Sequence, residues 1–165
     1  MKLIILFIAL CPIAAFSQTK SYGTLRPLFV SYSNEDASYG GVFSTGVRGK
    51  DASIGIGVGG IKFPHVSTVY VPVFGEFSFF VDRIKDAGPF FNFQAGYGFF
   101  SDGNVSGGLF VHPNAGFLID CGSGVRLLIT GGYISSDFKV KALYPYDNST
   151  SYSSHGFTLS IGVML

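Results

Sequence analysis

The stretch SHGFTLSIGVML, residues 154–165, alternates apolar residues with small or polar ones. The apolar positions are Phe157, Leu159, Ile161, Val163 and Leu165, and between them stand Thr158, Ser160, Gly162 and Met164. A repeat of two residues predicts a β-strand whose two faces meet different surroundings. The fold therefore depends on which surroundings the apolar face meets.

The composition of the whole chain resembles that of its last strand. The chain has 165 residues, of which 47% are hydrophobic and only 13% are charged, with 23 Gly and 18 Phe. Soluble domains usually carry about 25% charged residues. After the N-terminal segment, no apolar run is long enough for a spanning helix. Apolar residues spread over many short segments are typical of a membrane β-barrel.

Glycine and turn residues divide the chain into eight predicted strands. Their ranges are about 22–32, 39–49, 52–62, 69–82, 89–100, 107–119, 125–136 and 154–165. Most have the length of about nine to eleven residues, or slightly more, that a tilted strand needs to cross a bilayer. No segment has a 3.6-residue period, so we predict no helix in the mature protein. Pro72 and Pro113 predict bulges or local gaps in strand pairing.

The predicted connections alternate in length along the chain. Residues 49–51, 82–88 and 120–124 form compact turns, whereas 33–38, 63–68, 101–106 and 137–153 are mostly longer. An even number of strands places all the compact turns at one end of a barrel and the longer loops at the other. Short turns on the periplasmic side and longer loops outside are typical of outer-membrane barrels.

The N-terminal segment predicts a secretory signal peptide over residues 1–17, followed by a barrel domain over 18–165. A lysine, an apolar run and small residues before the cleavage point make up the signal. A retained anchor is disfavoured by Pro12, and a lipoprotein acylated at Cys11 is disfavoured by the bulky Leu10. Without the leader, basic and acidic residues balance, so the chain has no electrostatic basis for binding nucleic acid. Cys121 is then the only cysteine of the mature chain, so no internal disulfide is expected.

Four segments carry a resemblance to a known class of protein. They are YVPVFGEF (70–77), FFNFQAGYGFF (90–100), HPNAGFLID (112–120) and GFTLSIGVML (156–165). With the signal peptide, they resemble small OmpA/OmpX-like, eight-stranded outer-membrane β-barrels of Bacteroidetes type. The resemblance implies an all-β, antiparallel up-and-down barrel in the outer membrane of a Gram-negative bacterium. It also implies insertion by the barrel-assembly machinery and contact with outer-membrane lipid and lipopolysaccharide.

If the apolar faces meet lipid, the opposite faces form an interior polar network. The residues predicted there include Arg26, Arg48, Glu76, Asn92, Gln94, His112, Asn114 and Arg126. A buried carboxylate needs a partner, and we expect Glu76 to pair with one or more of the three arginines. This network could line an ion path or only stabilise the interior. We favour a plugged lumen, because eight strands leave an interior just wide enough for side chains.

The sequence contains no motif for catalysis or for a cofactor. There is no G-x-S-x-G, no pair of histidines spaced as on a metal-binding helix, no C-x-x-C and no calcium loop. We therefore expect no catalytic residue, no metal and no cofactor. A lipid A-modifying barrel enzyme remains a weaker alternative, and so does a narrow porin-like channel. A soluble lipocalin-like binder would show the same periodicity with its two faces exchanged.

The longest connection, residues 137–153, offers a candidate recognition surface. Its candidate residues are Tyr144, Tyr146, Asn148 and Tyr152. Tyrosine with serine and asparagine suits adaptable recognition surfaces. The same residues also describe a solvated loop with tyrosines at the membrane interface, and we favour this second interpretation. The sequence identifies no ligand. The function it favours is a structural or surface-interaction role, without enzymatic activity.

Overall fold

The computed structural model describes residues 19–32, 37–62, 68–81, 87–101, 105–140 and 150–165. Its strands are β1 (Lys20–Tyr32), β2 (Ser38–Arg48), β3 (Ala52–Lys62), β4 (Val69–Phe80), β5 (Ala87–Phe100), β6 (Val105–Ser106), β7 (Gly108–Asp120), β8 (Arg126–Val140) and β9 (Thr150–Met164). Eight of them are long and correspond to the eight predicted strands, and β6 is a short addition. The predicted leader, residues 1–17, lies outside the described residues.

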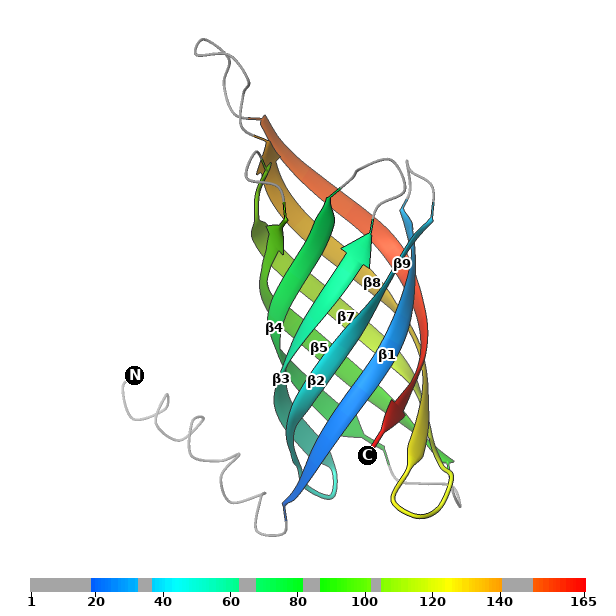
Figure 1. Cartoon of the computed structure of the whole chain (residues 1–165). Helices are drawn as coiled ribbons and strands as arrows, with labels where there is room; N and C mark the ends of the chain where they lie inside the picture. Colours follow the sequence, from blue (N-terminus) through cyan, green and yellow to red (C-terminus); the bar gives the residue numbers. More distant parts are fainter. Residues whose placement is uncertain (1–18, 33–36, 63–67, 82–86, 102–104, 141–149) are drawn as a thin grey trace, which may run out of the picture.

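The eight long strands form one closed antiparallel barrel (Figure 1). Each long strand pairs with the next along the chain, and β9 pairs with both β8 and β1. The predicted meander is therefore confirmed. Because the last strand, β9, pairs with the first strand, β1, the sheet has no open edge at this seam.

Four prolines lie within strands. Pro89, near the start of β5, is paired with Phe117, and each of the other three coincides with a gap in one of the two ladders of its strand. The gaps occur at Pro27 between β1 and β9, at Pro72 between β3 and β4, and at Pro113 between β7 and β8. The register is the same on both sides of each gap, so no residue is inserted. The expected bulges at Pro72 and Pro113 are therefore wrong, and the expected local gaps are right. Proline has no N–H to donate, which accounts for the interrupted pairing.

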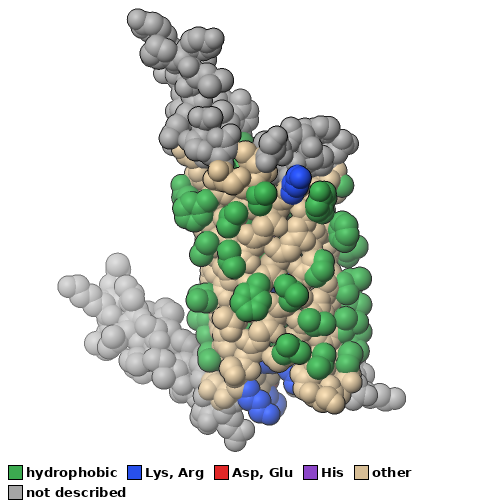
Figure 2. Space-filling view, in the orientation of Figure 1, with side chains coloured by type: hydrophobic (Ala, Val, Ile, Leu, Met, Phe, Trp, Pro, Cys, Tyr) green, Lys and Arg blue, Asp and Glu red, His purple; other side chains and the backbone are tan. Residues whose placement is uncertain are grey.

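The outward face of the barrel is apolar. Leu159, Ile161 and Phe157 of the last strand are 57%, 55% and 70% exposed. Similar side chains cover the outer face between the two rims in Figure 2, whereas the basic side chains visible there lie near the rims. A lipocalin-like protein would direct these side chains inward, so that alternative is wrong. Apolar residues outside and polar residues inside define a membrane-spanning barrel.

Within the described ranges, no helix is long and apolar enough to cross a membrane.

The two ends of the barrel differ in their connections. At one end, Gly122, Ser123 and Gly124 adopt left-handed backbone conformations, with φ of 81°, 55° and 82°. They make the tight turn between β7 and β8. The turn is closed by hydrogen bonds of 3.0 Å from the Cys121 N–H to Val125 O and from the Val125 N–H to Gly122 O. At the other end, β8 continues to Val140 and β9 begins at Thr150, so this hairpin rises above its neighbours (Figure 1). The predicted strands, which end at residue 136 and begin again at residue 154, are shorter here.

The apolar belt predicts the effect of a charge placed on it. Leu159→Arg, on the outward face of β9, should lower the free energy of unfolding in lipid vesicles by about 2–4 kcal/mol. The matched control is Ser153→Arg, which is exposed on the same face nearer the loop end of the strand. There the cost should be about 0–1 kcal/mol. Urea titration measures both, and equal costs would contradict the assignment of the outer face.

Candidate functional site

The interior of the barrel consists of an apolar cluster, a polar layer and a second apolar cluster. The upper seal, at the loop end, comprises Leu28, Val30, Tyr32, Val42, Ile61, Tyr70, Phe74, Phe110 and Ile134. The lower seal, at the end with short turns, comprises Tyr22, Phe80, Phe90, Leu118, Leu128 and Met164. Between them lie buried polar side chains on all the long strands except β3, whose buried serine lies nearer the short turns. The lumen between the two clusters is therefore filled with side chains.

Glu76 on β4 lies in the polar layer and is 4% exposed. Its Oε1 accepts hydrogen bonds from the hydroxyls of Tyr22 and Ser44, both at 2.7 Å. Its Oε2 accepts from Arg26 Nη2 at 3.1 Å, from Gln94 Nε2 at 3.1 Å and from Asn92 Nδ2 at 3.4 Å. Five donors thus surround one carboxylate, and this satisfaction offsets the cost of burying its charge.

Arg26 supplies the positive charge opposite Glu76. The two side chains are 3% and 2% exposed, and they meet across the lumen from β1 and β4, which are not adjacent strands. The ion pair therefore links two walls of the barrel. Arg26 Nε is buried without a hydrogen-bond partner. Loss of Glu76 would remove the counter-ion of the Arg26 guanidinium, so even less would offset the free-energy cost of burying its charge.

The other two predicted arginines lie elsewhere, which corrects the expectation of one network containing all three. Arg48 stacks on the Phe80 ring at 3.9 Å and donates to Met164 Sδ at 3.4 Å, within the lower seal. Arg126 pairs with Asp120 at 3.4 Å, with the Arg126 side chain 26% exposed. Both belong to the end of the barrel with short turns, because each begins or ends a strand there.

A relay of side chains continues from Glu76 to β9. Gln94 donates to Glu76, so its carbonyl Oε1 faces His112 Nδ1 at 2.8 Å. Because that oxygen can only accept, Nδ1 carries the proton. In the neutral ring, Nε2 then accepts from the Thr158 hydroxyl at 2.9 Å. The relay joins β4, β5, β7 and β9 through buried groups.

The remaining polar residues extend the network between neighbouring strands. Asn114 donates to Asn92 at 2.9 Å, and Asn92 donates to Ser78 at 2.8 Å. Thr24 and Ser44 share a hydrogen bond of 2.6 Å. Thr130 and Ser160 share another, between β8 and β9. These contacts link the polar side chains of neighbouring strands to one another.

Gly55 makes room for one of the donors to Glu76. It lies opposite Glu76 on β3, and a Cβ at this position would come within 2.5 Å of the Tyr22 hydroxyl. The absence of a side chain therefore lets Tyr22 reach the carboxylate. The neighbouring Gly57 similarly accommodates the ring of Phe74. The glycine-rich face of β3 thus serves packing within the lumen.

Tyr22, Thr24 and Ser44 belong to the hydrogen-bond network around Glu76 and were not predicted from the sequence. All three are buried on the inward faces of β1 and β2. Tyr22 and Thr24 lie four and two residues before Arg26, so strand alternation places them on the same face as that arginine. The irregular pattern of the first strands, including Pro27, obscured this signal.

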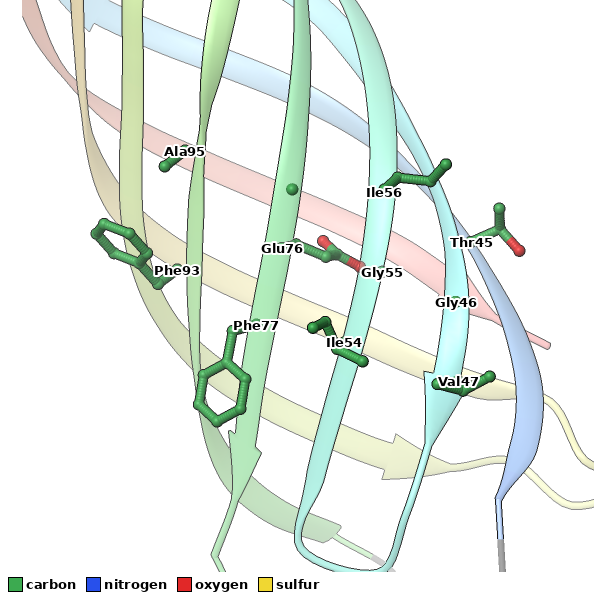
Figure 3. A pocket seen from close by; sticks show the side chains of 11 residues that line it. Thr45, Gly46, Val47, Ile54, Gly55, Ile56, Glu76, Phe77, Phe93 and Ala95 are labelled. Carbon is green, nitrogen blue, oxygen red and sulfur yellow. The ribbon is translucent and has the colours of Figure 1, made fainter. Parts of the chain in front are cut away.

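A recess of about 630 Å³ lies on the opposite, outward face of the same strands. Ile54, Ile56, Phe77 and Phe93 surround the small residues Gly75 and Ala95. In Figure 3 the phenyl rings of Phe77 and Phe93 lie apart from the Glu76 carboxylate, which belongs to the alternate, inward face of β4. The lining is mainly apolar, with Thr45 as an exposed polar side chain, and it suits lipid acyl chains.

The described residues contain no cluster of side chains that could hold a metal ion. No group of three or more His, Cys, Asp or Glu side chains comes together among them. His112 is 3% exposed between Gln94 and Thr158, and His155 stacks on Tyr133 at 6.1 Å. His112 is therefore sealed from any substrate, and His155 contacts an aromatic ring on the outward face.

The candidate loop residues are only partly described. Tyr144, Tyr146 and Asn148 lie outside the described residues, and the backbone of Tyr152 lies in β9 opposite Phe138. A recognition role for these residues stays a prediction.

Comparison with known proteins supports the fold. No family model matches the chain, and no curated protein sequence matches it. The crystal structure of Neisserial surface protein A is similar, with a TM-score of 0.63 and 13% identity over 90% of this chain and 97% of that one. A designed transmembrane β-barrel gives a TM-score of 0.47 at 14% identity, covering 87% of this chain and 95% of that one. The N-terminal β-barrel domain of Pseudomonas aeruginosa OprF gives 0.47 at 9% identity, covering 90% and 100%.

These findings define the class of the protein as an eight-stranded, closed membrane β-barrel. The likeness to Neisserial surface protein A is a likeness of fold alone, because the identity is 13%. A relation to Bacteroidetes-type barrels stays a prediction from the sequence.

The buried ion pair predicts a specific pattern of mutant stabilities. Glu76→Leu should lower the free energy of unfolding in lipid vesicles by about 3–5 kcal/mol, because it leaves the Arg26 guanidinium buried without its counter-ion. The double variant Glu76→Leu with Arg26→Met removes both charges, so it should be more stable than Glu76→Leu alone. Urea titration of both single variants and the double variant measures the coupling. Additive effects would show that the two side chains do not stabilise each other.

Proposed function

We propose that this protein is a sealed outer-membrane barrel of a Gram-negative bacterium with a structural and surface-interaction role. It anchors its longer loops at the cell surface and carries out neither transport nor catalysis. Its partners are outer-membrane lipid and lipopolysaccharide around the apolar belt, and the barrel-assembly machinery during insertion. The observation that carries the proposal is the closed lumen between the upper and lower seals.

The two seals support a barrier to ions. In the upper seal, Ile61 and Tyr70 are fully buried, and Phe110 is 1% exposed. The ring centroids of Tyr70 and Phe110 lie 6.4 Å apart, and those of Phe74 and Phe110 lie 5.6 Å apart. An ion entering this layer would lose its hydration without gaining polar ligands, which costs several kcal/mol or more. No observation favours the channel alternative over this barrier.

The outer face supports a place in a bilayer. Within the described strands, the charged residues are either inward, as are Arg26 and Glu76, or close to a rim, as are Lys20 and Lys62. The belt between the rims therefore presents no charge to the hydrocarbon. Short turns at one end and a raised β8–β9 hairpin at the other support an orientation with the hairpin outside.

The sealed lumen predicts that the barrel does not conduct. Protein extracted from membranes of cells expressing the full chain, and added to a planar lipid bilayer, should give no current steps. A known porin added to the same bilayer serves as the positive control. Reproducible single-channel steps that scale with the amount of this protein would contradict the sealed lumen and favour the narrow channel.

Cys121 offers a direct test of orientation and location. It is exposed in the short turn between β7 and β8. A membrane-impermeant maleimide should leave Cys121 unlabelled in intact cells and label it once the outer membrane is permeabilised. The matched control carries Cys121→Ser with Asn148→Cys in the longest loop, and it should be labelled in intact cells. The reverse pattern would contradict the proposed orientation.

A further inference from the structure

The mouth of the barrel at the end with short turns contains a basic recess that the sealed-barrel function does not use. The recess has a volume of about 510 Å³. Its lining residues are Lys20, Ser21, Tyr22, Arg48, Gly49, Lys50, Gly124, Arg126, Met164 and Leu165. Four of these side chains are cationic, and none of the described side chains lining the recess is acidic. Figure 2 shows basic side chains gathered at the lower rim of the barrel.

The strand pairing explains why these cations converge. Lys20 and Arg48 are direct partners across β1 and β2. Arg126 is the partner of Met164, whose sulfur accepts a hydrogen bond from Arg48. The neighbouring acidic side chains do not line the recess: Asp120 bonds to Arg126 from the side at 3.4 Å, and Asp51 is exposed in the turn beside Lys50. The positive charge is thus local, because basic and acidic residues balance over the mature chain.

Arg48 gives the recess a fixed floor. Its side chain is 8% exposed and is held by stacking on Phe80, with the guanidinium carbon 3.9 Å from the ring centre. Lys20 and Lys50 are exposed at the rim, further from the centre of the barrel than Arg48. A planar guanidinium inside the recess and flexible ammonium groups at its rim suit a phosphate oxyanion, which accepts hydrogen bonds from both kinds of donor.

The recess also opens towards the lipid-facing side of the barrel. Ser21 and Leu165 line it from the outward faces of the β1–β9 seam, where Gly23 and Leu165 exchange backbone hydrogen bonds of 3.2 and 2.9 Å. Leu165 is 70% exposed, and Leu25 further along β1 is 57% exposed. An anionic group bound in the recess therefore has an apolar surface directly beside it. This continuity favours an amphipathic ligand over a soluble anion.

We infer that this recess binds the phosphate headgroup of an anionic phospholipid, with the acyl chains lying on the apolar surface of the β1–β9 seam. The inference rests on the proposed membrane location, in which the end with short turns faces the periplasmic leaflet. Lys20 and Lys50 hold the phosphate at the rim, and Arg48 and Arg126 provide the positive field beneath it. The bound lipid would link the β1–β9 seam, where the barrel closes, to the surrounding bilayer.

Native mass spectrometry tests the lipid site on protein extracted from membranes of cells expressing the full chain. Phosphatidylglycerol and phosphatidylcholine with identical acyl chains are added in turn to the wild type, to Lys20→Gln with Lys50→Gln, and to the control Lys62→Gln at the opposite rim. Wild type and control should prefer phosphatidylglycerol. The double variant should bind it about thirtyfold more weakly, from a factor of about five for each cation near an anionic headgroup. Equal binding by the double variant and the control would overturn the inference.

Two further readouts separate the remaining outcomes. Glycerol 3-phosphate, added at the lipid concentration, should not displace phosphatidylglycerol; displacement would show a site for soluble phosphate and overturn the lipid assignment. Gel mobility before and after boiling checks that each variant is a folded barrel. If wild type shifts on boiling but shows no preference for phosphatidylglycerol, only the lipid site is wrong. If wild type is absent from the membrane fraction, the proposed function fails first.

Discussion

In the hydrocarbon of a bilayer, a backbone N–H or C=O without a partner costs several kcal/mol, so a sheet can span it only by closing on itself. Here closure depends on β9, which pairs with β8 on one side and with β1 on the other. Once the sheet is closed, each strand has one face towards lipid and one towards the lumen. The alternation seen in residues 157–165 then becomes a division between an apolar outside and a filled inside.

The filled interior answers a second constraint, which is that polar groups on the inward faces must bond to each other. Glu76 meets this constraint with five donors from β1, β2 and β5, and its ion pair with Arg26 spans the lumen. A buried ion pair is weak evidence for stability, because desolvation offsets much of the attraction. Its position instead suits it to fix which strands face each other, because a shift of register would leave either charge buried without its partner. Apolar clusters lie on both sides of this layer.

The strand ranges, the closed meander and the direction of each face could be predicted because period-two alternation and turn residues report them directly. The inward positions of Glu76 and Arg26 followed from the same alternation. Their partners Tyr22 and Ser44 were missed, since contacts across the lumen join strands far apart in the sequence and depend on barrel size and tilt. The place of Arg126 was misjudged for a related reason: strand alternation gives a side chain's face but not its depth, and Arg126 lies close enough to the rim to pair with Asp120. The two apolar seals could not be predicted for the same reason, because the sequence does not show which inward residues lie at the same depth in the barrel.

The central claim is that the chain forms a closed barrel in an outer membrane, and gel mobility tests it most directly. The outer-membrane fraction from cells expressing the full chain is run in detergent, with one sample boiled and the other kept cold. A closed barrel resists cold detergent because its backbone hydrogen bonds are internal to the sheet, so the cold sample should run as a compact species that shifts on boiling. A protein found in the soluble fraction, with the same mobility before and after boiling, would contradict the account.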